Sequence, residues 1–407
     1  MNQFFETISY IFLFCVFYFE IFILLSFLEK QKSVGTQKPL EEIPVTILVP
    51  CFNEESTIVG TMESIFQLDY PKDKLQIIVI NDGSTDKTAE LLEPYNEYHN
   101  IQVIHKENGG KHTALNLGLE YCTTSIVGCL DADSFVVPDA MRQIMHKFED
   151  PTVMAVTPST VIWKAKTLIQ KMQRAEYHYG NLIRYAMSLI HAIHIAPGPF
   201  SFFRVEVFEK IGKYKHAHNT EDMEIAMRMQ KNGLKIVHAA RAVVYTSSPN
   251  TIKKLYKQRV RWVSGFLGNL IDYRKMLFNK KHGDLGLIVL PMALLSILLT
   301  IPFVLASAYS TIRGLQGTFN DYWIYGLKHW RWENFDIFFI NMNTMWLLSS
   351  VLLLVMIFLL ACGKRVTSGK WEISGDFLFL MLYTFIAPFW LWKAIYNNIQ
   401  KKQTSWR

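Results

Sequence analysis

Two aspartates, Asp131 and Asp133, are the residues whose types and spacing are best suited to chemistry. They follow the apolar run Ser125–Leu130 and flank a single alanine. We expect the run to be a strand whose alternation sends both carboxylates to the same side. Two buried like charges are costly without a cation, and a hard cation prefers oxygen ligands. The pattern therefore predicts a site for Mg²⁺ or Mn²⁺ that could bridge to a diphosphate. The alternative, two loop aspartates at the surface, is weakened by the apolar lead-in.

A second acidic group lies in the segment Asn219–Met229, where Glu221 and Asp222 follow Thr220. Asn219 and Thr220 are typical of a helix N-cap, and acids in a first helical turn are stabilising there. Capping alone would explain these acids. A carboxylate at this place is also what a transfer reaction needs to deprotonate an acceptor hydroxyl.

Polar residues follow the first two predicted strands. The first strand ends in Pro50–Glu55, which contains Asn53 and Glu54, and the second ends in Ile80–Asp86, which contains Asp82. A carboxylate at the carboxyl end of a strand can accept hydrogen bonds from the base or ribose of a nucleotide. The alternative is that Asp82 or its neighbours Ser84 and Asp86 only cap a helix.

The segment Asn108–Gly118 places two glycines and Lys111 at a predicted helix start. Backbone amides and an ammonium group at such a place suit a pyrophosphate. The segment is not a Walker motif, and a solvated loop lysine is the alternative.

The segment Gln258–Trp262 puts Gln258, Arg261 and Trp262 within one helical turn. Arg261 can contact phosphate oxygens and stabilise a departing diphosphate, while Trp262 offers a flat face to a sugar ring. An amphipathic membrane-surface helix with an interfacial tryptophan would show the same residues.

These residues need a sheet to position them, and the sequence from about Pro44 to Ser248 predicts one. Short β-branched runs at 45–50, 75–82, 101–105 and 125–133 alternate with turns and helical stretches. Strands that alternate with helices imply an α/β domain with a mostly parallel sheet and ligands at the carboxyl ends of the strands.

Apolar segments surround this domain. Residues Ile8–Leu28 are long enough to span a bilayer and, without a basic start or cleavage site, are expected to be a retained anchor. Three more spans are predicted at about 285–308, 335–362 and 377–395. Basic residues after the first span favour a cytoplasmic domain. A four-span path would put Lys401 and Lys402 outside, so the side of the tail stays open, and Pro388 could break the last segment into a re-entrant element.

Two amphipathic stretches, Ile162–Ile190 and Ile252–Phe278, are expected to be helices in the headgroup region, with ordinary core-facing helices as the alternative. The formal charge of +7 over 407 residues is spread along the flanks of apolar segments, which favours a membrane surface and gives no sign of nucleic-acid binding. The five cysteines form no CxxC pair and are expected to be free thiols.

Taken in chain order, the motifs form a set: Asn53-Glu54, Asp82, Asp131-x-Asp133, Thr220-Glu221-Asp222 and Gln258-x-x-Arg261-Trp262. This set resembles the processive family-2 glycosyltransferases, and the compact size looks most like the bacterial poly-β-1,6-N-acetylglucosamine synthases and the related chitooligosaccharide and hyaluronan synthases. The resemblance covers roughly residues 44–277.

The resemblance implies a GT-A fold and a role for each motif. Donor and nucleotide would be bound by Pro50, Asn53, Glu54, Asp82, Lys111 and Asp131. Asp131 and Asp133 would hold Mg²⁺ or Mn²⁺, and Asp222 would be the general base, with Glu221 beside it. Acceptor and pyrophosphate would be bound by Gly198 and Arg204, which lie in a loop expected after a strand, and by Gln258, Arg261 and Trp262. Trp406 would be the remnant of a gating segment.

The expected domains are an N-terminal anchor and linker (1–43), a GT-A domain (44–250), an interfacial helix (251–280) and a C-terminal membrane region (281–407). The expected function is inverting polymerisation of a β-linked polysaccharide, with UDP-N-acetylglucosamine as donor, and its extrusion. The alternatives are a lipid glycosyltransferase that adds one or a few sugars, and a non-enzymatic membrane scaffold. The expected location is the plasma membrane, with the growing glycan or a lipid as acceptor, membrane lipids around the spans, room for a small accessory membrane subunit, and no nucleic-acid partner.

Overall fold

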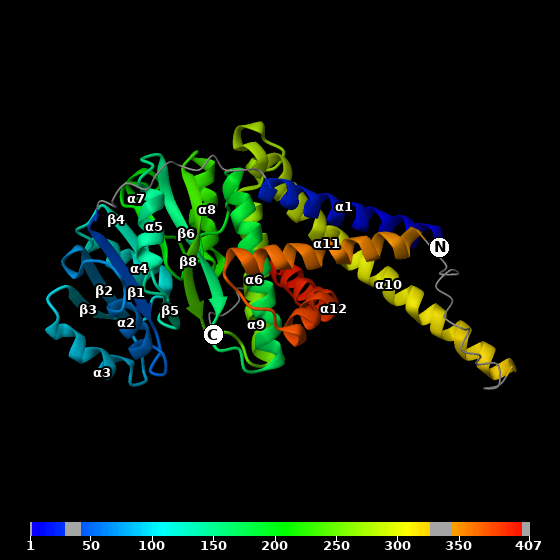
Figure 1. The fold of residues 1–407 in the computed structure, drawn as a ribbon, viewed down its shortest axis with the longest axis horizontal. Coiled ribbons are helices and arrows are strands. Elements are labelled where there is room, and N and C mark those ends of the chain that lie inside the picture. Colours follow the sequence, from blue (N-terminus) through cyan, green and yellow to red (C-terminus); the bar gives the residue numbers. More distant parts are fainter. Residues whose placement is uncertain (1, 29–41, 326–343, 401–407) are drawn as a thin grey trace.

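The computed structural model describes residues 2–28, 42–325 and 344–400. An α/β domain lies at one end of the molecule and a group of long apolar helices extends from it (Figure 1). Trp406 and the basic tail residues lie outside the described residues, as does the first part of the predicted span at 335–362.

The α/β domain is built on an eight-stranded sheet with the order β3-β2-β1-β4-β7-β6-β8-β5. Its strands are β1 (Val45–Cys51), β2 (Leu75–Asp82), β3 (Ile101–Lys106), β4 (Ile126–Cys129), β5 (Ser134–Val136), β6 (Val153–Ile162), β7 (Ser201–Arg204) and β8 (Lys235–Thr246). The helices of the domain are α2 (Ile58–Phe66), α3 (Thr88–Leu92), α4 (Lys111–Glu120), α5 (Ala140–Phe148), α7 (Glu206–Ile211) and α8 (Glu221–Lys231).

The prediction of an α/β domain is confirmed, but the sheet is mixed. Strands β3, β2, β1 and β4 are parallel neighbours, as predicted. Strand β7 is antiparallel to both β4 and β6, and β5 is antiparallel to β8. The first four strands therefore bring their carboxyl ends to one edge of the sheet, where β7 begins.

The predicted strand at 125–133 is shorter than expected. Strand β4 ends at Cys129, and Asp131 and Asp133 lie in a turn that leads into β5. The amide of Ser134 donates to the Asp131 carbonyl in this turn. Neither aspartate belongs to a strand. The prediction that strand alternation orients the two carboxylates is therefore wrong.

Two long helices lie between the sheet and the apolar helices (Figure 1), namely α6 (Leu168–Leu189) and α9 (Ile252–Asp272). Helix α6 packs on β6 and β8 and also on α1 (Asn2–Leu28), α11 (Thr344–Val366) and α12 (Ile373–Ile399), while α9 packs on α12. The predicted amphipathic stretches thus form helices with the sheet domain on one side and apolar helices on the other. Both helices are shorter than predicted, because Ile162 is the last residue of β6 and α9 ends at Asp272.

Among the described residues, three helical segments are apolar and long enough to cross a membrane: Glu6–Leu28 of α1, Leu285–Gly317, which begins just before α10 (Leu290–Tyr325) and runs through most of it, and Leu347–Val366 of α11. The fourth predicted span, α12, is bent by 53° between Tyr383 and Phe385. The three or four apolar helices fit a membrane protein.

The loop between α11 and α12 is fixed to α6. Lys364 and Asp376 form a buried ion pair of 2.7 Å across this loop, and the His178 ring of α6 lies 2.6 Å from the Thr367 hydroxyl. A Cβ atom at Gly363 or Gly369 would lie 2.4 Å from His178 atoms. The last turn of α11, which contains Gly363, and the loop, which contains Gly369, therefore pack on α6 so closely that only glycine fits at both positions.

Strands β4 and β7 pack closely on each other at Gly128. A Cβ atom at Gly128 would lie 2.4 Å from the Phe202 ring. We expect Gly128→Ala to lower the free energy of unfolding by about 1–3 kcal/mol, because the fully buried ring has no space to move. The measurement is the thermal unfolding midpoint in detergent, with Gly180→Ala as control, since nothing lies within 4 Å of a Cβ there. Equal midpoints for the two variants would contradict the expectation.

Candidate active site

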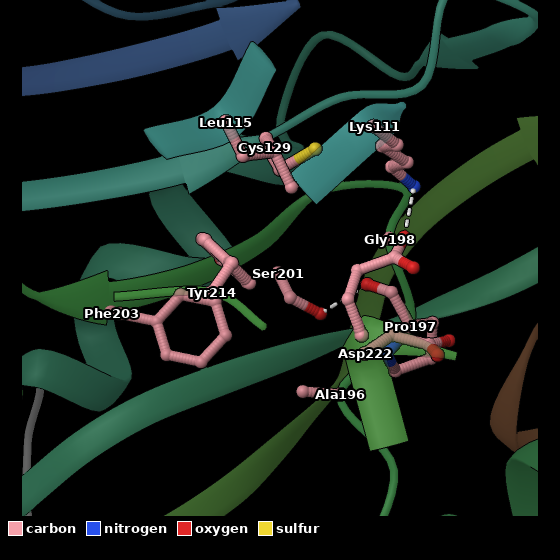
Figure 2. A pocket seen from close by; sticks show the side chains of 11 residues that line it. Lys111, Leu115, Cys129, Ala196, Pro197, Gly198, Ser201, Phe203, Tyr214 and Asp222 are labelled. Carbon is pink, nitrogen blue, oxygen red and sulfur yellow. Dashed lines mark hydrogen bonds and ion pairs between the residues drawn. The ribbon is translucent and has the colours of Figure 1, made fainter. Parts of the chain in front are cut away.

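The candidate site lies at the edge of the sheet where β1, β2 and β4 end and β7 begins. The small cavity there is lined by residues of α4, β4, β7, α8 and the loop before β7. Figure 2 shows Lys111, Gly198 and Asp222 converging on it from three of these elements.

Lys111 is the cation of the site. Its ammonium nitrogen lies 2.6 Å from the Asp131 carboxylate and 3.4 Å from the Glu221 carboxylate. The two carboxylates raise its pKa well above the usual value, against the lowering effect of burial. Lys111 therefore stays charged and joins the turn that carries Asp131 to the segment that carries Asp222.

Gly198 packs against this ion pair. A Cβ atom there would lie 2.5 Å from the Lys111 nitrogen and 2.9 Å from an Asp131 carboxylate oxygen. The Ala196 amide donates to the Asp222 carbonyl, and the Phe200 amide donates to the Cys129 carbonyl. The loop before β7 is thus bonded to both the end of β4 and the start of α8.

Asp222 is partly buried at the start of α8, beside the buried Glu221. Burial and the Glu221 carboxylate raise the pKa of Asp222 to about 6, while Lys111 and Arg261 act in the opposite direction. A carboxylate with such a pKa is suited to accept a proton near neutral pH.

Asp133 has the features of a metal ligand. Burial and the nearby carboxylates Asp131 and Glu54 raise its pKa to about 7. Over the residues that the structure describes, no three His, Cys, Asp or Glu side chains are grouped to hold a metal. Mg²⁺ is often bound by one or two carboxylates with substrate phosphates as the other ligands. Asp131 and Asp133 fit a cation of this kind.

Asn53 connects the loops that follow β1 and β2. Its backbone is left-handed with φ of 55°, its amide donates to the Ser84 hydroxyl, and its side-chain oxygen accepts from the Thr85 amide. The amides of Glu54 and Glu55 donate to Thr88 and Asp86 side chains. Ser84 and Asp86 thus accept backbone amides of the loop after β1, and the N-cap residue of the helix α3 that follows them makes no side-chain cap hydrogen bond.

Asp82 is only 3% exposed. Its carboxylate accepts from the Gly109 and Gly110 amides at 3.0 and 2.9 Å and pairs with Lys106 at 2.5 Å. Asp82 therefore fixes the glycine loop that leads into α4 and Lys111.

Arg204 lies away from this edge. Strand β7 is antiparallel to β4, with Ser201 opposite Cys129 and Arg204 opposite Ile126, the first residue of β4. The Arg204 guanidinium donates to the carbonyls of Val153 and Phe148 and stacks on the Phe148 ring. The predicted loop at 198–204 is thus a loop followed by a strand. Its first residue reaches the site and Arg204 does not.

Helix α9 carries Gln258, Arg261 and Trp262. The guanidinium of Arg259 lies 4.3 Å from the centre of the Trp262 ring. Arg259 also pairs with Glu176 of α6 at 2.7 Å, and Glu176 accepts from the Tyr383 hydroxyl of α12 at 2.7 Å. One face of Trp262 is thus covered by a buried network that joins α6, α9 and α12.

Some residues of the cavity were missed by the sequence reasoning. Ser201 and Tyr214 line it together with Pro197. The Ser201 hydroxyl donates to the Pro197 carbonyl at 2.6 Å, and Tyr214 is held by Asn116. No motif marks these residues, because they reach the cavity through the antiparallel placement of β7 and the loop after α7.

Comparison with known proteins shows which family this chain resembles. Residues 46–212 match the family described as Glycosyl transferase family 2. The chain is 30% identical over 318 residues to a poly-beta-1,6-N-acetyl-D-glucosamine synthase of Staphylococcus epidermidis, over 77% of this chain and 74% of that protein. It is 34% identical over 224 residues to a Staphylococcus aureus (strain COL) protein of the same name, over 54% of each chain.

Among solved structures, the mannosyltransferase PcManGT from Pyrobaculum calidifontis, in complex with GDP-Man and Mn²⁺, superposes with a TM-score of 0.68 and 20% identity. The superposition covers 98% of this chain and 99% of that one. This likeness confirms the predicted GT-A fold with apolar helices. The relatives do not favour a non-enzymatic scaffold or a lipid glycosyltransferase, and the chain belongs to glycosyltransferase family 2.

Proposed function

We propose that the protein is a membrane-bound inverting glycosyltransferase that polymerises N-acetylglucosamine from UDP-N-acetylglucosamine into a β-linked glycan. The observation that carries this proposal is that Lys111 and Asp222 line one cavity at the sheet edge, where Lys111 pairs with Asp131. The name of the relatives, poly-beta-1,6-N-acetyl-D-glucosamine synthase, supports the choice of sugar.

The donor would lie across the ends of β1, β2 and β4. Pro50, Asn53, Glu54 and Asp82 are assigned to the nucleotide side. Asp82 is buried, and its carboxylate accepts the amides of Gly109 and Gly110. We therefore assign to Asp82 an indirect part in nucleotide binding, in which it holds the glycine loop in shape. Asp131 and Asp133 would hold a divalent cation, Mg²⁺ or Mn²⁺, which when bound neutralises charge on the diphosphate.

The transfer step would use Asp222 as the base. Its carboxylate accepts the proton of an acceptor hydroxyl while that oxygen forms a bond to the anomeric carbon of the donor. The bond from this carbon to the phosphate oxygen breaks with inversion, and UDP leaves with the bonding electrons. The ammonium of Lys111 and the guanidinium of Arg261 stabilise the negative charge of the leaving group.

The acceptor would approach from α9, with Gly198 and Gln258 beside it. Since Arg259 covers one face of the Trp262 ring, the other face is assigned to an acceptor sugar. Arg204 is not included, because its guanidinium is bonded at the other end of β7.

The sheet domain is proposed to face the cytoplasm at the plasma membrane, where nucleotide sugars are available. The bent helix α12 supports a tail on the same side. Its Asp376 pairs with Lys364, its Tyr383 donates to Glu176 of α6, and its Asn398 donates to the Ser264 carbonyl of α9. Contacts with α6 and α9 along its length favour a re-entrant or interfacial helix over a fourth crossing.

The direct test of the function is product analysis. Purified protein in lipid vesicles is incubated with Mn²⁺ and one radiolabelled UDP-sugar at a time, and the product is digested with linkage-specific glycosidases. We expect a long glycan from UDP-N-acetylglucosamine that a β-1,6-specific hexosaminidase degrades. A product of one or two sugars on lipid, or a polymer from another donor alone, would contradict the proposal.

The base assignment predicts a large loss on Asp222→Asn. Transfer is expected to fall by about 10²–10⁴-fold, because the amide cannot accept the proton, while UDP binding persists. In the unaltered protein, the rate is expected to rise with pH through about 6, because the base must be ionised. The exposed carboxylate variant Asp73→Asn serves as control, and a rate for Asp222→Asn equal to that control would remove the assignment.

The metal assignment predicts a different result for Asp133→Ala. We expect UDP to bind this variant and the unaltered protein equally in a chelator, whereas added Mn²⁺ strengthens binding only to the unaltered protein. Isothermal titration with and without the metal measures both. An equal gain with Mn²⁺ in the two proteins would show that Asp133 is not a ligand.

The membrane path can be tested with reporter fusions. Alkaline phosphatase, which is active only outside the cytoplasm, is expected to be inactive after Arg407 and active after Tyr325 at the end of α10. A fluorescent protein that matures in the cytoplasm is expected to give the reverse pattern. Phosphatase activity after Arg407 would favour four crossings over three.

A further inference from the structure

The loop in front of Asp222 packs directly on α9. A Cβ atom at Gly265 would lie 2.3 Å from the Thr220 side chain, and one at Gly268 would lie 2.7 Å from the His218 ring. Both glycines are buried, as is Asn269 beside them. Only glycine, which has no Cβ atom, allows this loop to approach the helix so closely.

Asn269 bonds the loop to the helix. It is fully buried, and its amide nitrogen donates to the Thr220 hydroxyl at 2.9 Å and to the Gly265 carbonyl at 3.0 Å. The Thr220 hydroxyl donates in turn to the Ala217 carbonyl at 3.1 Å. The Thr220 carbonyl accepts the amides of Met223 and Glu224, so Thr220 begins the first turn of α8.

The backbone of this loop needs such support. Ala217 and His218 have φ values of 43° and 54°, in the left-handed region that is unfavourable for these residue types. His218 is also bonded to Asp272 at the end of α9, with Nε2 and a carboxylate oxygen 2.9 Å apart. Conformations of this kind persist only where surrounding contacts hold them.

We propose that Asn269 is a positioning residue that fixes the place of Asp222 relative to the acceptor. This inference rests on the proposed function, in which Asp222 is the base. Arg261 and Trp262, assigned to the leaving group and the acceptor, lie on the same helix as Gly265 and Asn269. One rigid helix therefore sets the distance between the group that takes the proton and the surface that holds the sugar.

A double-mutant cycle tests this role. Asn269→Ala removes the donor. Thr220→Val keeps the shape of the side chain but removes the acceptor, together with the hydrogen bond to the Ala217 carbonyl, and the third protein carries both changes. We expect each single variant to lower the turnover number about 10- to 100-fold, because small displacements of a base are costly, and the double variant to lose no more than either. Metal-dependent UDP binding is expected to stay within about twofold in all three.

A packing pair gives an independent readout. Gly265→Ala is expected to lower turnover in the same range by displacing Thr220, while Gly180→Ala on α6, where nothing lies within 4 Å of a Cβ, leaves it unchanged. The KM for UDP-N-acetylglucosamine should not move in either variant. If Asn269 only stabilised the fold, Asn269→Ala would instead lower both the thermal unfolding midpoint and the affinity for UDP.

The activity of Asp222→Asn distinguishes a failure of the base assignment from a failure of the positioning role of Asn269. If Asp222→Asn turns over normally, the base assignment fails and the positioning role falls with it. If Asp222→Asn is inactive but the losses of Asn269→Ala and Thr220→Val multiply, or Asn269→Ala is fully active, only the positioning role is overturned.

Discussion

The ion pair between Lys111 and Asp131 is the interaction on which the site depends. Four acidic side chains, Asp131, Asp133, Glu221 and Asp222, are brought to one edge of the sheet, where burial and neighbouring carboxylates raise the pKa of Asp133 and of Asp222. Lys111 contacts two of them and joins segments that are far apart in the sequence. Gly198 leaves the space for this contact. The arrangement keeps carboxylates together that would otherwise separate or take up protons.

Helices α6 and α9 connect this site to the membrane region. On one side they pack on the sheet domain, and on the other they pack on α12. The ion pair of Arg259 with Glu176 is largely buried, and Glu176 also accepts from the Tyr383 hydroxyl. A buried ion pair of this kind fixes a specific orientation more than it adds stability. Because the Arg259 guanidinium lies over the Trp262 ring, the same ion pair also fixes the position of this ring.

Much of the fold could be predicted from the sequence, because the first strands are local runs of β-branched residues that end in polar turns. Asn53, Asp82 and Asp131 were placed at one sheet edge by that pattern alone. Strand β7 could not be placed in this way, since its antiparallel direction depends on pairing with β4 and β6. That direction decides that Gly198 reaches the cavity and Arg204 does not. A break in the last apolar segment was expected at Pro388, and α12 is instead bent between Tyr383 and Phe385.

The structural and functional explanations of the motifs are not exclusive. Asp86 and Ser84 accept backbone amides, and Asp82 holds the glycine loop, as ordinary turn residues do. Those bonds determine where Lys111 begins α4, and therefore where the cation of the site lies. Thr220 begins α8 in the same manner and places Glu221 and Asp222 in its first turn. Each motif read alone is a turn or a cap, and together the turns and caps build the cavity.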